Sequence, residues 1–468
     1  MKALIIMMAL FLLLLASGCA ALPSLMKPVL EEEGEVFVYL QPFPQEAARL
    51  QFSIDHLSAV RSDGAEFPLP LSLAEFKQGE VRRQRLIATG ILPPGQYQGL
   101  SYTVTKASLT GEEGEANLLV PEEPVKIPFP FNIRRKKALV LSLVFRYAES
   151  VQSGFSFTPG FHLVTPPMPA IGLVGYVVNP GNNTITVFDK KSGQVASIMA
   201  MGKGPQGVAF DRSAGKAYVS LEGEDAIEVI DVTAESSVNR INLKVGDGPR
   251  EISLTPDGRF LLIVNAGSRT LSIVDPLSLV ELNRVPVGEG PRSLLVGPGG
   301  TRCYVFNGLS NTLSVIDIPN SATVATISTE PGPLMGQFNR KGDQLYVIHE
   351  GSPYLWVFDP ASLSVVKRVF VGSGISFIKL DTATDRIYGY RKLDVRVEVY
   401  DPFSLLPAEY ITATSGIVYM TIDGEENNLY LVSAEKNLLM TVNLISRKIV
   451  SETDVGENPA RVTMMGER

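Results

Sequence analysis

The chain has 468 residues, of which 45% are hydrophobic and 19% are charged, and its formal net charge at pH 7 is −7. This composition is typical of a folded protein with a large core and excludes the disordered class. The acidic balance argues against a nucleic acid as partner.

The N-terminus has the features of a secretory signal. Lys2 precedes an apolar run from Ala3 to Leu15, which is short for a membrane span and ends in small residues. The stretch LLASGCAA resembles the lipobox of bacterial lipoproteins. That resemblance implies a cleaved signal peptide over residues 1–18, a lipid group such as palmitate on Cys19, and export to the outer membrane, because Ala20 is not aspartate. An ordinary signal with an unrelated cysteine is the alternative.

Between the signal and a later repeat array lie a predicted tether, domain and linker. Residues 19–33 form the tether, and residues 34–165 contain strand-like runs such as EVFVYLQPF and KALVLSLVF separated by turns, which predicts a small β-sandwich. Residues 166–173 form a proline-rich linker. The stretch LPPGQYQGLSYTVTKASL and the segments after it are similar to transthyretin-like or carboxypeptidase-regulatory-like domains, which implies no catalytic residues.

From residue 174 the sequence repeats with a period close to 42. Segments such as ITVFD and LSVID end in an acidic or amide residue at steps of 42 residues, with one step of 44, and these residues are Asp189, Asp231, Asp275, Asp317, Asp359, Asp401 and Asn443. A second marker, YVVN or a variant of it, keeps the same period. Short alternating runs with turn residues between them predict four antiparallel strands in each unit, which is typical of a β-propeller blade.

The motifs YVVN, NNTITVFD and GPREISLTPDGRFLLIVN also resemble the YVTN family of seven-bladed propellers. The resemblance covers residues 174–468 and implies a seven-bladed ring, with fading motifs where Arg391 and Ser433 replace the asparagine. The fold class is therefore predicted as all-β, a small sandwich followed by a propeller. The first unit lacks its first strand and the chain ends with a spare one, so strand 461–465 is expected to close the blade begun at Tyr176.

Few residues suit catalysis or metal binding. The three histidines, His56, His162 and His349, are not clustered, and no known metal, haem or nucleotide motif occurs, so no cofactor, no metal site and no catalytic residue are predicted. His349 occupies a slot that Asn179, Asn265 and Asn307 fill elsewhere, which favours a structural role. The repeated aspartates are expected to bind their own turns. Cys303 stands where other units have Ala or Leu, and is interpreted as a small core residue.

The residue after the Gly-Pro turn, or after the variant of this turn, differs from repeat to repeat, although the repeat pattern around it is kept. In the resembling propellers this turn borders the mouth of the central channel. The residues there are Gln206, Arg250, Arg292, Leu334, Ser376, Val418 and Ala460. Arg250 and Arg292 are expected on adjacent blades, where two guanidinium groups could bind a carboxylate. Two solvated surface arginines are the alternative.

These observations predict a lipid-anchored envelope protein, at the periplasmic face of the outer membrane or the cell surface. Its propeller is expected to be monomeric and to bind or scaffold another envelope protein without catalysis. The alternatives are a propeller enzyme such as a lactonase-like hydrolase acting at the channel mouth, and a surface-layer or adhesion component.

Overall fold

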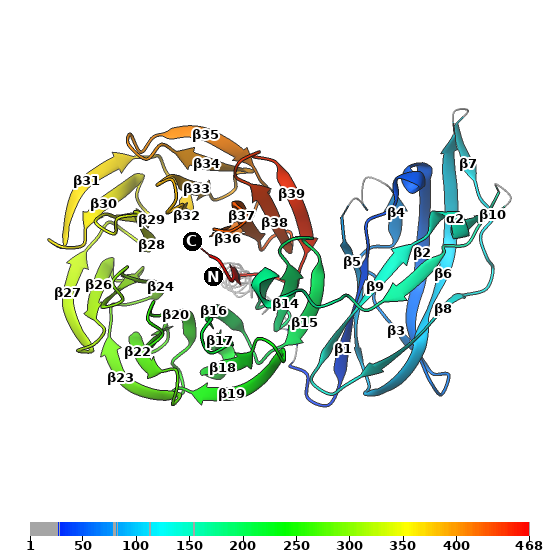
Figure 1. Ribbon diagram of the computed structural model, residues 1–468, viewed down its shortest axis with the longest axis horizontal. Coiled ribbons are helices and arrows are strands. Elements are labelled where there is room, and N and C mark those ends of the chain that lie inside the picture. Colours follow the sequence, from blue (N-terminus) through cyan, green and yellow to red (C-terminus); the bar gives the residue numbers. More distant parts are fainter. Residues whose placement is uncertain are drawn as a thin grey trace, which may run out of the picture.

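The computed structural model describes residues 27, 29–77, 81, 83–111, 114–152 and 155–467, so the predicted signal and Cys19 lie outside the described residues. It contains two β-structured parts that lie side by side, a ring on the left and a smaller part on the right of Figure 1. Within the described ranges, no helix has the length and apolar character needed to span a membrane.

The smaller part is a sandwich of two sheets. The first sheet has the order β12-β9-β1-β5, with β1 and β9 parallel. Its strands are β1 (Gly34–Leu40), β5 (Arg85–Leu92), β9 (Ala138–Phe145) and β12 (Phe161–Val164). The second contains β2 (Leu50–Arg61), β3 (Glu66–Pro68), β4 (Glu75–Lys77), β6 (Gly95–Gly111), β7 (Gly114–Asn117) and β8 (Val125–Ile133).

Short elements complete this part, namely η1 (Gln45–Arg49), α2 (Tyr147–Ser150), β10 (Val151–Gln152) and β11 (Ser156–Phe157). Side chains of both sheets form one apolar core, which includes Val38 of β1 and Phe52 of β2. The predicted sandwich is therefore confirmed. The predicted linker contains one turn of 3-10 helix, η2 (Ile171–Leu173), directly before the ring.

The ring consists of seven four-stranded antiparallel sheets, which we number as blades 1 to 7 in chain order. Blade 1 contains β13 (Val174–Asn179), β14 (Thr184–Asp189), β15 (Val195–Ala200) and the last strand β40 (Arg461–Met464). Blade 2 contains β16 (Pro205–Asp211), β17 (Lys216–Leu221), β18 (Ala226–Asp231) and β19 (Ser236–Asn242), with η3 (Glu222–Glu224) between β17 and β18. Blade 3 contains β20 (Pro249–Leu254), β21 (Leu261–Asn265), β22 (Thr270–Asp275) and β23 (Val280–Pro286).

The other four blades repeat this plan without insertions. Blade 4 contains β24 (Pro291–Val296), β25 (Arg302–Asn307), β26 (Thr312–Asp317) and β27 (Ala322–Ser328). Blade 5 contains β28 (Pro333–Phe338), β29 (Leu345–His349), β30 (Tyr354–Asp359) and β31 (Ser364–Phe370). Blade 6 contains β32 (Ile375–Leu380), β33 (Ile387–Arg391), β34 (Arg396–Tyr400) and β35 (Pro407–Thr412), and blade 7 contains β36 (Ile417–Asp423), β37 (Asn428–Ser433), β38 (Leu438–Asn443) and β39 (Ile449–Asp454).

The hydrophobic pattern of each strand follows its place in the blade. The second strands are buried at every position, as β21 is, or at all positions but one, as β25 is, because neighbouring blades cover both faces. The outermost strands of blades 2 to 6, such as β23, are mostly exposed, whereas β15 of blade 1 packs against the N-terminal domain. Cys303 lies in the second strand of blade 4, is fully buried and packs in an apolar cluster, which confirms its interpretation as a core residue.

Turns inside the blades are held by the repeated acidic and amide residues. The Asp189 side chain accepts a hydrogen bond from the backbone N–H of Lys191 at 2.8 Å, and Asp231 accepts one from Thr233 at 2.9 Å. Equivalent bonds occur at Asp275, Asp317, Asp359, Asp401 and Asn443. The expected structural role of this series is therefore confirmed.

The last strand closes the ring as predicted. β40 pairs with β13, and Thr463 lies opposite Tyr176. Next to this pairing, the Lys190 ammonium contacts the Asp423 carboxylate of blade 7 at 3.0 Å and donates to the Met465 carbonyl at 2.8 Å. The side chains of Lys190 and Asp423 are both 0% exposed, so this buried ion pair connects the first blade to the last blade.

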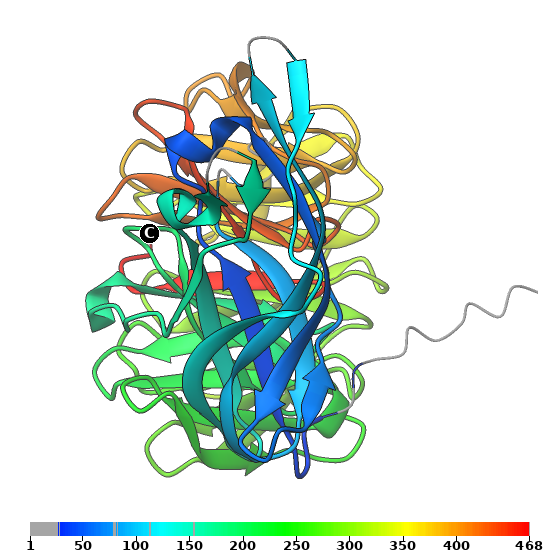
Figure 2. The same cartoon turned by 90° about the vertical axis from the view of Figure 1, so that its right-hand side faces the viewer.

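The N-terminal domain lies across the same closing seam, in front of the edge-on ring in Figure 2. On blade 7, Asp454 accepts hydrogen bonds from the Arg85 Nε at 2.9 Å and from the backbone of Leu86 at 3.1 Å. On blade 1, the backbone N–H of Val195 donates to Gln84 at 2.7 Å. Phe37, Tyr39 and Val140 pack against Val195 and Ile198 in a small apolar cluster. The domain thus bridges the two blades that meet where the ring closes.

We expect Lys190→Met to lower the free energy of unfolding by about 3–5 kcal/mol, because it leaves the buried Asp423 charge without its partner. Urea denaturation at pH 7 measures the loss. The double variant Lys190→Met/Asp423→Asn is the control, and it should recover part of the stability since no unpaired charge is left. Equal stability of wild type and Lys190→Met would show that this ion pair does not fasten the ring.

Candidate functional site

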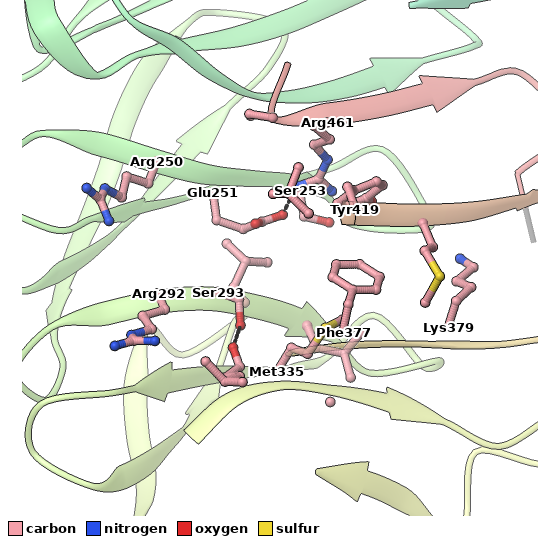
Figure 3. A pocket seen from close by; sticks show the side chains of 18 of the residues that line it. Arg250, Glu251, Ser253, Arg292, Ser293, Met335, Phe377, Lys379, Tyr419 and Arg461 are labelled. Atoms are coloured by element: carbon pink, nitrogen blue, oxygen red, sulfur yellow. Dashed lines mark hydrogen bonds and ion pairs between the residues drawn. The ribbon is translucent and has the colours of Figure 1, made fainter. Parts of the chain in front are cut away.

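The residues predicted for the channel mouth line one cavity on the ring axis. The cavity has a volume of about 600 Å³ and is lined by the first strand of the blades. Gln206, Arg250, Arg292, Leu334 and Ser376 all contribute to it, as do Val418 and Ala460. The structure therefore brings together every residue of the predicted ring, each from a different blade. Figure 3 shows both mouth arginines at one end of this axial cavity.

The turns that carry these side chains are held by residues of the preceding blade. The side chain of Asn183 accepts a hydrogen bond from the backbone of Gly204 at 2.8 Å, and Asp225 accepts one from Gly248 at 2.7 Å. Asn311 binds Gly332 in the same way at 2.8 Å. Gly204, Gly248 and Gly332 have positive φ angles between 56° and 68°, which glycine adopts at little cost. The mouth residues of blades 2, 3 and 5 are therefore placed by fixed turns.

A β-bulge follows each of these turns in blades 2 to 7. The pairing register shifts between Pro249 and Ile252 in blade 3, and similar shifts occur in the other five blades. A bulge sets two residues against one, so two successive side chains can face the same side. The second residue after the turn therefore also lines the cavity, and this second ring consists of Gly207, Glu251, Ser293, Met335, Phe377, Tyr419 and Arg461.

The sequence reasoning identified the first ring and missed the second. A regular strand alternates its faces, which would turn the residue after Arg250 away from the axis. Because of the bulge, this residue faces the axis after all. The sequence does contain a signal for this, since charged and aromatic residues both occur at the position, whereas a core-facing position would be uniformly apolar.

At the mouth, both arginines have an acidic neighbour. The Arg250 Nε contacts the Glu222 carboxylate at 2.7 Å, and the Gln206 amide donates to the same carboxylate at 2.8 Å. An Nη atom of Arg292 contacts Glu350 at 2.8 Å. The Arg292 side chain lies over Gly308, where a Cβ atom would come within 2.5 Å of its Nε. Glycine at 308 therefore makes room for this arginine.

Below the mouth, a charged contact and an aromatic contact adjoin each other at Tyr419. Arg461 of β40 forms an ion pair with Glu251 of β20, and its guanidinium lies 4.9 Å from the centre of the Tyr419 ring. The Tyr419 ring meets the Phe377 ring edge-on at 5.0 Å. Burial raises the pKa of the Tyr419 hydroxyl above its ordinary value, so the phenol is neutral. Met335, Phe377 and Tyr419 form an apolar wall, and the ion pair of Arg461 with Glu251 adjoins this wall at Tyr419.

Deeper along the axis, the fourth residue after the turn lines the cavity in several blades. Ser253, Gln337 and Lys379 belong to this level. Glu467, near the end of the chain, reaches the same level and binds the hydroxyl groups of Thr421 and Thr463, the latter at 3.1 Å. The Lys379 ammonium lies 3.7 Å from the Glu467 carboxylate. The last residues of the chain thus form part of the cavity wall.

His349 lies away from the cavity, in the asparagine slot predicted for it. In blades 1, 3 and 4 this asparagine donates to Thr or Ser hydroxyls five and seven residues later, as Asn265 does to Thr270 and Ser272. Blade 5 has Tyr354 and Trp356 at those positions, and the His349 ring instead packs on Trp356 with centroids 4.8 Å apart.

Blade 6 makes a comparable exchange. Arg391 fills the slot and pairs with Glu398, seven residues later, at 2.9 Å. The slot residue and the residues it contacts therefore differ together between blades. No group of three or more His, Cys, Asp or Glu side chains arranged for a metal ion occurs in the parts of the chain that the structure describes.

The sequence of residues 176–386 matches the family model described as YNCE-like beta-propeller, which is less than half of the chain. No curated protein matches significantly. Among solved structures, a functionally unknown protein from Desulfotomaculum acetoxidans has a TM-score of 0.55 at 14% identity, covering 62% of this chain and 98% of its own. Dihydro-heme d1 dehydrogenase NirN, in complex with DHE, has a TM-score of 0.51 at 14% identity, covering 64% and 77%.

Hydrazine synthase from Kuenenia stuttgartiensis also matches, with a TM-score of 0.48 at 19% identity, covering 55% of this chain and 88% of its own. The chain is a β-propeller repeat protein by sequence match and by fold. The identities to the solved structures are too low to show more than that shared fold.

We expect His349 to make stability depend on pH. The side chain is 2% exposed, and burial lowers the pKa of its ring from 6.5 to about 4, while Glu330 opposes and Arg368 supports this shift. Between pH 6.5 and pH 4 this histidine is therefore protonated in the unfolded chain and neutral in the folded chain. The free energy of unfolding falls as the pH falls through this range. At pH 4.5 the loss from this ring is about 2–3 kcal/mol.

The measurement is urea denaturation at pH 7 and pH 4.5 for wild type and His349→Leu. The leucine does not titrate, so the variant should lose less stability on acidification than the wild type does. The same loss in both proteins would contradict a neutral buried histidine.

Proposed function

We propose that this chain is a binding or scaffolding protein whose partner docks at the mouth of the axial cavity. The observation that carries the proposal is the convergence of non-repeating side chains from all seven blades at that mouth. The repeated residues hold turns and blades together, so they do not require Gln206, Arg250 or Arg292 at these positions. Side chains that vary on a rigid frame are where propellers carry function.

The mouth favours a partner with a carboxylate or another anionic group. Arg250 is 51% exposed, and its bond to Glu222 through Nε leaves both terminal nitrogens without a bonded partner among the described residues. Arg292 is 38% exposed and pairs with Glu350, which is 58% exposed. Ion pairs that are this exposed contribute about 0–1 kcal/mol, so an incoming carboxylate can displace Glu222 or Glu350 at little cost.

We propose that a lipid on Cys19 anchors the protein at the outer membrane. Each lipidated tether would carry one YVTN-type propeller. The Lys27 carbonyl accepts a hydrogen bond from Asn183, whose side chain also holds the mouth turn at Gly204. Seven residues lie between Cys19 and Lys27, and the eight steps from one to the other span at most about 28 Å in an extended chain. A lipid on Cys19 would therefore hold the mouth side of blade 1 close to the membrane.

The double variant Arg250→Ala/Arg292→Ala tests docking at the mouth. After cross-linking in the native envelope, the proteins captured by wild type should fall at least tenfold with this variant, because both anion-binding groups are gone. The control is Arg259→Ala/Arg340→Ala, which removes two exposed arginines from the turns that follow the first strands, at the far end from the mouth. Equal capture by all three proteins would refute docking at the mouth.

Lipidation is tested separately with Cys19→Ser. Cells grown with radiolabelled palmitate should label the wild-type protein and leave the variant unlabelled, and the variant should move from the membrane fraction to the soluble fraction of the envelope. An unlabelled wild-type protein, or membrane attachment that persists in Cys19→Ser, would contradict the lipid anchor.

A further inference from the structure

Lys379 is a buried amine in the axial cavity that the proposed docking does not use. It lies in β32, two residues after Phe377, and its side chain is 12% exposed. Figure 3 shows it at the end of the cavity opposite the mouth arginines. The apolar wall of Met335, Phe377 and Tyr419 lies between. A small molecule that enters at the mouth would pass this wall before it reaches the amine.

The ammonium form of Lys379 is poorly compensated. Its nearest carboxylate oxygen, on Glu467, is 3.7 Å away, which is longer than a hydrogen bond. That carboxylate is already engaged by the hydroxyl groups of Thr421 and Thr463. Arg461 brings a second positive charge into the same cavity, and its own carboxylate partner is Glu251. A cation next to another cation in a partly apolar site is the arrangement that activates lysine amines in enzymes.

The electrostatics of the surroundings favour the free amine. Burial lowers the pKa of Lys379 below its ordinary value, and Arg461 adds to this effect. Glu467 and Asp381 act in the opposite direction, but burial outweighs them. The neutral amine is therefore more abundant at pH 7 than on a surface lysine.

We propose that Lys379 captures aldehydes or ketones with an apolar or aromatic body in the axial cavity, as a reversible imine on its amine nitrogen. The apolar wall would hold the body of the ligand. The volume of about 600 Å³ is in the range of small-molecule sites. This capture site does not depend on docking of a partner at the mouth.

The chemistry needs no group beyond those present. The ammonium gives one proton to Glu467, and the nitrogen lone pair forms a bond to the carbonyl carbon while the π pair moves to the oxygen. A proton passes from nitrogen to that oxygen and gives a carbinolamine. Glu467 then protonates the hydroxyl, which leaves as water while the nitrogen lone pair forms the C=N bond. The products are a protonated imine, one water molecule and the original carboxylate.

Reductive trapping tests the proposal on the full-length protein. Benzaldehyde and sodium cyanoborohydride at pH 7 convert an imine to a stable benzyl-lysine, which peptide mass spectrometry locates. Lys379 should react at least tenfold faster than Lys367, an exposed lysine of β31 in the same molecule. Rates at Lys379 equal to or below those at Lys367 would overturn the proposal.

Two variants separate capture from other effects. Phe377→Leu should slow trapping by benzaldehyde at Lys379 severalfold and leave Lys367 unchanged, because it removes the aromatic wall but keeps the site apolar. Arg250→Ala/Arg292→Ala should leave trapping at Lys379 unchanged. Loss of partner capture in that double variant, with trapping retained, would show that the two sites act separately. A Phe377→Leu variant that traps at the wild-type rate would refute the apolar part of the site.

Discussion

The pairing of β40 with β13 is the constraint on which the rest of the structure depends. It joins segments that are almost 290 residues apart in the chain, and it gives blade 1 its innermost strand, so that the seven blades form one closed ring. Lys190 and Asp423 hold the same seam from inside, and Arg85 and Gln84 of the N-terminal domain contact it from outside. Closure brings the first strands together on one axis, so the axial cavity exists only because the last strand returns to the first blade.

Each repeat contains two kinds of residue. Some residues stabilise the turns and strands of the blade, and we call them frame residues, whereas others face the axis. Each frame residue is bound to neighbours a fixed number of residues away, as Asn265 is to Thr270 and Ser272. Such a residue can change only together with its contacts, which is what happens at His349 with Trp356 and at Arg391 with Glu398. The residues at the axis have contacts that differ from blade to blade, as Arg250 has with Glu222 and Arg461 has with Glu251. The cavity can therefore combine an apolar wall, two mouth arginines and a buried lysine on a symmetric scaffold.

Much of the fold could be predicted from the sequence because its determinants are local and repeated. The 42-residue period, the turn-binding aspartates, the buried Cys303 and the closing strand all follow from spacing alone. The second cavity ring could not be predicted, since it depends on a bulge that breaks the alternation of strand faces. Lys379 and Glu467 were missed for another reason. Lys379 belongs to blade 6 and Glu467 follows the closing strand of blade 1, and only closure places them at the same level of the cavity.

The contacts of the N-terminal domain indicate how it stabilises the ring. Blade 1 combines strands from both ends of the repeat array, so closure of the ring depends on the pairing of β40 with β13 inside this blade. The domain binds the outer strands of blades 1 and 7, through Val195 on one side and Asp454 on the other. It contacts the edge of the ring and leaves the mouth uncovered, so it can strengthen closure without blocking the cavity.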